Sequence, residues 1–122
     1  MKPMKLVIIL LALAAAPGAV SVAGAADAEP GLDTIKVLGS VNGQALACSE
    51  GQVSARAKAL MLAHAPKTAL YGTAYEEATQ AAYLAQARSA NACPDNISLL
   101  SRINELALQL SVALPVVATQ SK

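Results

Sequence analysis

The two cysteines, Cys48 and Cys93, place the strongest constraint on how this chain can fold. Both follow a segment that looks like an export signal, so they are expected to meet an oxidising compartment, where two thiols normally pair. Redox-active pairs are usually separated by two residues, whereas these two are 45 positions apart. We therefore predict a structural disulfide that joins two or three helices, worth about 3–4 kcal/mol in the chain-entropy model.

The N-terminal segment has the three regions of a secretory signal peptide. Two lysines precede an apolar run over residues 6–16, Pro17-Gly18 breaks this run, and residues 23–25 are small. This order predicts that residues 1–25 are removed and that the product is periplasmic or secreted. The alternative is an N-terminal membrane anchor, because the uncharged stretch as far as residue 26 is just long enough to cross a bilayer.

The chain that remains after cleavage is one small domain with almost no net charge. Loss of Lys2 and Lys5 lowers the count of basic residues from 9 to 7, against 8 acidic residues, so the net charge becomes −1. A basic face that grips a phosphate backbone is therefore not available, and nucleic acid is excluded as a partner class. No motif for a cofactor is present.

Along the mature chain we interpret residues 26–32 as a flexible leader, residues 33–114 as a helical domain and residues 115–122 as a flexible tail. Apolar residues recur at helical spacings of three and four, and no strand pattern of comparable strength appears. The predicted fold class is all-α, a small antiparallel three- or four-helix bundle stapled by one disulfide.

The first helical stretch is the least regular. Asp33 is predicted to cap a helix that begins at Thr34. Asn42-Gly43 is a turn signal, so we favour one bent helical region over a short element followed by a helix from Asn42. An amphipathic helix is predicted from Gln44 to Ala63 and ended by Pro66. Its packed face is expected to carry Leu46, Val53 and Leu60, with Cys48, Ala55 and Leu62 beside them.

Two further helices are predicted. After a connector over residues 68–72, Thr73 and Glu76 have the spacing of a capping box, and an alanine-rich helix continues to about Ala90. Pro94 is expected at the first position of the last helix, which Pro115 ends. One face of this helix is apolar and carries Leu99, Leu100, Ile103, Leu106, Ala107, Leu110 and Leu114.

Few residues suggest chemistry. His64 is the only histidine and has no ligand-type residue at metal-binding spacing, so no metal site is predicted. Its place in the last turn of a helix favours a contact with the negative end of the helix dipole. Glu76 and Glu77 are neighbours and point about 100° apart on a helix, so they cannot form a facing catalytic pair.

The three aromatic residues are Tyr71, Tyr75 and Tyr83. Tyr75 and Tyr83 are eight positions apart and are expected to share a helix face. Packing at the core and its rim is the favoured interpretation, and ligand stacking is the alternative. These tyrosines, with His64 and Glu76, are the candidate interaction or pocket residues.

We therefore expect a non-enzymatic binding or interaction module of the cell envelope, because the chain has more alanine and leucine than one small core needs. The expected partner is another envelope protein or a second copy. An enzyme is the alternative if a pocket brings His64 against Tyr71, Tyr75 or Glu76. The overall plan resembles small periplasmic acid-stress chaperones and helical toxin-immunity proteins, although the charged content of 14% counts against the chaperones.

Overall fold

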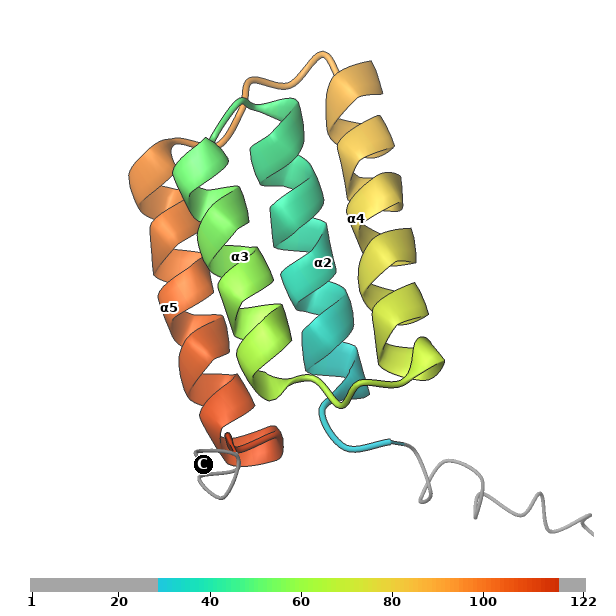
Figure 1. The fold of residues 1–122 in the computed structure, drawn as a ribbon. Helices are drawn as coiled ribbons and strands as arrows, with labels where there is room; N and C mark the ends of the chain where they lie inside the picture. The colour runs from blue at the N-terminus through green and yellow to red at the C-terminus, as the bar shows by residue number, and fades with distance from the viewer. Residues whose placement is uncertain (1–28, 117–122) are drawn as a thin grey trace, which may run out of the picture.

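The computed structural model describes residues 29–116, and all the regular structure in this range is helical (Figure 1). Successive helices run in opposite directions, which confirms the predicted all-α bundle. The predicted signal peptide lies outside the described residues. The four helices are α2 (Leu32–Ala47), α3 (Gly51–His64), α4 (Ala69–Arg88) and α5 (Asn96–Ala113).

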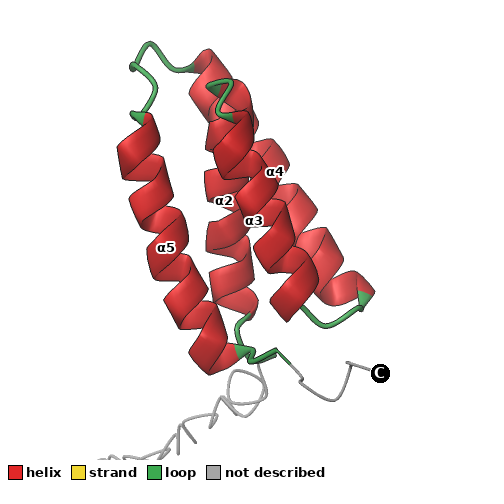
Figure 2. Ribbon diagram, turned by 60° about the vertical axis from the view of Figure 1, so that its left-hand side comes forward, coloured by secondary structure: helices red, strands yellow, loops and turns green. Residues whose placement is uncertain are grey.

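Helix α2 is the centre of the bundle and packs against each of the other three helices. Helices α3 and α5 also pack against each other, whereas α4 packs against α2 alone. In Figures 1 and 2, α4 and α5 accordingly lie on opposite sides of the molecule. The fold is thus a three-helix core of α2, α3 and α5, with α4 attached along one side of α2 and parallel to it.

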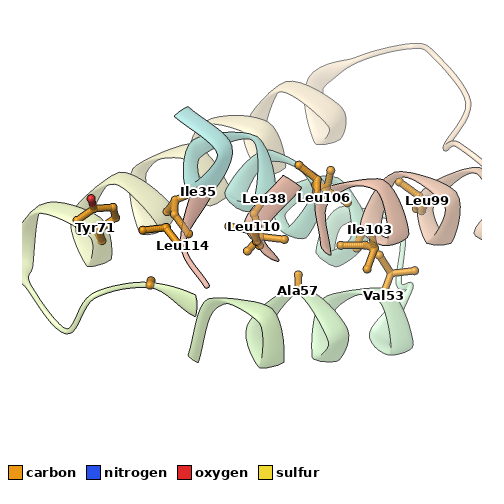
Figure 3. Close-up of a cluster of buried hydrophobic side chains, with 13 residues drawn as sticks. Ile35, Leu38, Val53, Ala57, Tyr71, Leu99, Ile103, Leu106, Leu110 and Leu114 are labelled. Atoms are coloured by element: carbon orange, nitrogen blue, oxygen red, sulfur yellow. The ribbon is translucent and has the colours of Figure 1, made fainter. Parts of the chain in front are cut away.

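The hydrophobic core belongs almost entirely to α2, α3 and α5 (Figure 3). Full burial of one large aliphatic side chain contributes about 1.5–3 kcal/mol. The large side chains that are fully buried are Ile35, Leu38, Val41, Val53, Leu99, Ile103 and Leu110. None of them lies on α4, whose one buried residue is Tyr71. Helix α4 must therefore be held by something other than a large apolar face.

Two glycines on α2 allow α4 to approach closely. Gly39 and Gly43 are one turn apart, and both face α4. A methyl group on Gly39 would lie 2.5 Å from the Tyr75 carbonyl oxygen, and one on Gly43 would overlap the Thr79 carbonyl oxygen. Because glycine has no side chain, the two backbones come into direct contact along this line, which we call the glycine seam.

A disulfide and a hydrogen bond hold one end of the bundle together. The predicted disulfide joins Cys48, after α2, to Cys93, between α4 and α5, with 5.8 Å between the Cα atoms. At the same end, Asn96 donates a hydrogen bond to Glu50 at 2.7 Å. A disulfide of this kind indicates an oxidising, non-cytoplasmic location.

The predicted helix from Gln44 to Ala63 is wrong, because the chain breaks at Cys48–Glu50. The favoured continuation of the first helix through Asn42-Gly43 is confirmed, since α2 runs from Leu32 to Ala47. Ser49 adopts a left-handed conformation with φ of 59°, which turns the chain into α3. The break also changes the helical phase, so that Leu46 and Leu62 are exposed and do not share a buried face. Helix α2 itself begins at Leu32, two residues before the expected start.

The start of α4 also differs from the prediction. Residues 69–72 are already helical, and Thr73 and Glu76 lie inside the helix, so they form no capping box. The earlier start places Tyr71 in the first turn, where its side chain is buried. At α5, Asp95 is the N-cap and accepts a hydrogen bond from the Ser98 amide at 2.7 Å, so Pro94 precedes the helix.

Candidate functional site

The candidate residues fall into two separate groups. His64 and Tyr71 lie at the end of the bundle opposite the disulfide, where each is bonded to a backbone carbonyl. Tyr75, Glu76 and Tyr83 line a groove along α4 that does not include His64. The hollow that His64 lines does not include Tyr71, Tyr75 or Glu76.

His64 connects the last turn of α3 to the end of α5. Its Nδ1 lies 2.6 Å from the Leu114 carbonyl oxygen, and the protonated nitrogen donates this hydrogen bond. The predicted contact of the imidazole with a helix C-terminus is thus present, but the helix is α5, not α3 itself. A hollow of about 450 Å³ lies beside the ring. Its lining comes from the segment before α2, the ends of α3 and α5 and the α3–α4 connection, and it includes Pro30, Pro66 and Pro115.

Tyr71 ties α4 to the segment that precedes α2. Its hydroxyl donates a hydrogen bond to the Pro30 carbonyl oxygen at 2.8 Å. Burial, together with the nearby Glu29 carboxylate, raises the pKa of the Tyr71 hydroxyl. The side chain is only 3% exposed. Tyr71 is therefore a structural latch and offers no surface to a partner.

The second group forms a groove of about 350 Å³ between α2 and α4. Thr79, which lies one turn from both Tyr75 and Tyr83, continues the same wall of the groove. We call this feature the α2–α4 groove, and its lining residues are Asn42, Leu46, Tyr75, Glu76, Thr79, Gln80 and Tyr83. The structure therefore brings together three of the five residues that the sequence singled out.

A short chain of hydrogen bonds crosses the base of this groove and joins three helices. Ser54 on α3 donates to the Asn42 side-chain oxygen at 2.9 Å, and the Asn42 amide donates to the Thr79 hydroxyl at 3.2 Å. Asn42 is only 7% exposed, so its bonds fix the wall of the groove. Asn42 and Thr79 were not among the candidate residues, because no local sequence signal relates two positions that are 37 residues apart.

The Tyr75 hydroxyl is buried without a hydrogen-bond partner among the described residues. Burial raises the pKa of Tyr75 to about 12. The α2–α4 groove combines apolar surface with neutral polar groups and one exposed carboxylate, Glu76.

Two further observations bear on the kind of site that this domain offers. Within residues 29–116, no three His, Cys, Asp or Glu side chains lie close enough to share a metal ion. In the same range, none of the helices combines the length and apolar character needed to cross a membrane.

Comparison of the chain with protein-family models, with curated proteins and with solved structures found no match.

Proposed function

We propose that this protein is exported, that residues 1–25 are removed, and that the mature chain acts as a non-enzymatic binding module in the cell envelope. The α2–α4 groove would hold a segment of another envelope protein. Export is supported by the order of regions at the N-terminus and by the disulfide, which is typical of oxidising compartments.

The observation that carries the proposal is the apolar mouth of the groove. Leu46 is 47% exposed and Tyr83 is 43% exposed, and they face the same groove from the two helices. Tyrosine, which has an apolar ring and a polar hydroxyl, is a typical anchor residue of protein interfaces. An aliphatic or aromatic side chain of the partner would fill the space between them.

Charge at the rim narrows the chemistry of the partner. Glu76 is exposed and belongs to the groove lining. A Lys or Arg beside the apolar anchor of the partner would complement this carboxylate and orient the segment. We therefore expect a segment with one apolar anchor and at least one nearby basic residue.

Contacts within the protein hold the α2–α4 groove in a fixed shape. The glycine seam fixes the backbone of α4 against α2, and the bond between Asn42 and Thr79 holds the groove wall. A binding surface that is already ordered loses little conformational entropy when a partner arrives. This is consistent with recognition of a flexible partner segment by a rigid groove.

Site-specific photo-crosslinking in intact cells tests the proposal. A photoreactive side chain at Gln80, on the groove rim, should give a discrete adduct with another envelope protein, and Tyr83→Ser should reduce its yield severalfold. The matched control is the same group at Ala55, an exposed position on α3. Equal adducts from both positions, or no effect of Tyr83→Ser, would refute binding in this groove.

A further inference from the structure

A polar recess lies beside the central helix, on the side away from the α2–α4 groove. It has a volume of about 330 Å³ and is lined by α2, α4, α5 and the connection between α4 and α5. Helix α2 contributes Ser40 and Gln44, which lie about 200° around the helix from Asn42 and Leu46 of the groove. The recess is therefore a separate site, independent of the function proposed for the groove.

The recess is formed because α4 and α5 do not pack against each other. Both helices lie against α2, which leaves a hollow over the face of α2 that carries Ser40 and Gln44. The connection from α4 to α5 closes one end of this hollow (Figure 1). Asn91 supplies this end wall, and its backbone amide donates a hydrogen bond to the Ser89 hydroxyl at 2.9 Å. The disulfide at Cys93 ties the same connection to the end of α2.

Arg102 supplies the only charge in the lining of the recess. Its Nη1 donates to the Gln44 side-chain oxygen at 2.7 Å, which holds the guanidinium of α5 against α2. Glu105 lies three positions further along α5 but is not part of the lining. Because Gln44 engages only Nη1, the edge formed by Nε and Nη2 stays available. A guanidinium edge of this kind binds a carboxylate through two parallel hydrogen bonds.

The other polar groups of the lining are neutral, and they offer both donors and acceptors. The Ser40 hydroxyl donates to the Lys36 carbonyl oxygen at 3.2 Å, so the oxygen of Ser40 can still accept. The Ser89 oxygen accepts from the Asn91 amide, so the hydrogen of Ser89 can still donate. The side-chain nitrogen of Gln44 is a further donor, because only its oxygen is engaged. Hydroxyl groups of a ligand, which both donate and accept, match this set.

We propose that the polar recess binds a small hydroxylated carboxylate, such as a sugar acid, with the carboxylate on Arg102. One guanidinium among neutral groups matches the single charge of a carboxylate, whereas a phosphate monoester carries a charge of about −1.5 to −2. The ligand hydroxyls bond to the serine and glutamine side chains, and its carbon skeleton lies on the methyl groups of Ala82 and Ala85. An open site with one charge binds weakly, with a Kd of about 1 mM.

Nuclear magnetic resonance of the exported protein, with its disulfide intact, tests this site with D-glucuronate as the probe. The chain has only three arginines, Arg56, Arg88 and Arg102, so their Nε–H signals can be followed one by one. Glucuronate should shift the Arg102 signal and the amide signals around the recess, and the shifts should saturate. D-glucose has a similar ring without the carboxylate and should bind at least tenfold more weakly.

Two variants and a matched control locate the binding. Arg102→Gln should weaken glucuronate binding at least tenfold. The control is Arg56→Gln, because Arg56 is also exposed and also donates to a neutral side-chain oxygen, that of Asn104 at 2.8 Å, but does not line the recess. Ala85→Leu fills the recess without a change of charge and should weaken binding severalfold. Circular dichroism melting checks that each variant is folded.

Four results would overturn the proposal. Shifts that do not saturate, or that are lost equally in Arg102→Gln and Arg56→Gln, would mean that glucuronate is attracted to the surface without a site. Full binding in a folded Ala85→Leu variant would place the ligand outside the recess. Equal binding of glucose would mean that the carboxylate is not recognised. Tighter binding of inorganic phosphate than of glucuronate would reduce the site to an anion contact of Arg102.

Discussion

Replacement of Gly43 by alanine tests most directly how α4 is held. In an open helix, this change would stabilise the protein by about 1 kcal/mol, because alanine is the better helix former. Here the new methyl group would overlap the Thr79 carbonyl oxygen and lie 2.8 Å from the Tyr83 amide nitrogen. These are backbone atoms, which cannot rotate away. The whole of α4 must therefore move outward from α2.

The cost of this movement can be set against the gain in helix propensity. Overpacking of a tight contact costs about 1–3 kcal/mol, and loss of the bond between Asn42 and Thr79 costs about 1 kcal/mol more. After subtraction of the propensity gain of about 1 kcal/mol, Gly43→Ala should lower the free energy of unfolding by about 1–3 kcal/mol. For a domain of this size, each kcal/mol lowers Tm by about 4–8 °C.

Urea unfolding followed by circular dichroism, with the disulfide intact, measures this effect. The matched control is Gly72→Ala in α4, where a new methyl group would meet nothing within 4 Å and should stabilise the protein by up to about 1 kcal/mol. Gly39→Ala should behave like Gly43→Ala, and the double variant should lose less than the sum, because α4 moves only once. If Gly43→Ala is as stable as Gly72→Ala, the glycine seam does not hold α4.

Three further perturbations have expected outcomes. Reduction and alkylation of Cys48 and Cys93 should lower Tm by about 12 °C or more in calorimetry, from about 3 kcal/mol of lost chain constraint. The pKa of Tyr75 is raised above its ordinary value of 10 to about 12, so stability should fall as pH rises through this interval, and less steeply in Tyr75→Phe. Hydrogen bonds from Ser98 to the Asp95 carboxylate lower the pKa of Asp95. The ionised carboxylate therefore adds stability above its ordinary pKa, and this stability is lost as pH falls through the lowered pKa. Helicity should nevertheless persist to about pH 3.

Each of these outcomes can fail in a distinct way. An unchanged Tm after complete alkylation would show that the disulfide adds no stability. Identical alkaline unfolding of the wild type and Tyr75→Phe would show that this hydroxyl is not buried in solution. Cooperative loss of helicity or exposure of apolar surface near pH 3–4, measured by dye binding, would instead favour an acid-triggered chaperone. Asp95→Asn keeps a side chain that can cap the helix but that does not titrate, so it is the control for the loss of stability at low pH.

The parts of the fold that the sequence predicted correctly depend on local periodicity or on cysteine chemistry. Leu99, Ile103, Leu106 and Leu110 repeat at three and four residues without interruption, and all four are buried. The two cysteines allow only one intrachain pairing, and it is present. In both cases the signal lies in residue types and spacings, so no knowledge of a neighbouring helix is needed.

The errors occur where a distant helix decides the local structure. Asn42-Gly43 is a turn signal in isolation, but Gly43 is needed for contact with α4, and Asn42 bonds to Thr79, 37 positions away. Neither requirement is visible until α4 is placed beside α2. The α2–α4 groove shows the same limit. Tyr75 and Tyr83 share one wall, as expected from their spacing on one helix. Leu46 was expected to be packed in the core, but it forms the opposite wall of the groove.

The glycine seam and the α2–α4 groove share residues, which connects stability to the proposed binding. Thr79 contributes its carbonyl oxygen to the seam and also lines the groove, and the same is true of Tyr75. Outward movement of α4 in Gly43→Ala should therefore widen the groove and reduce crosslinking from Gln80. If crosslinking from Gln80 is unchanged in Gly43→Ala, the glycine seam does not control the shape of the groove.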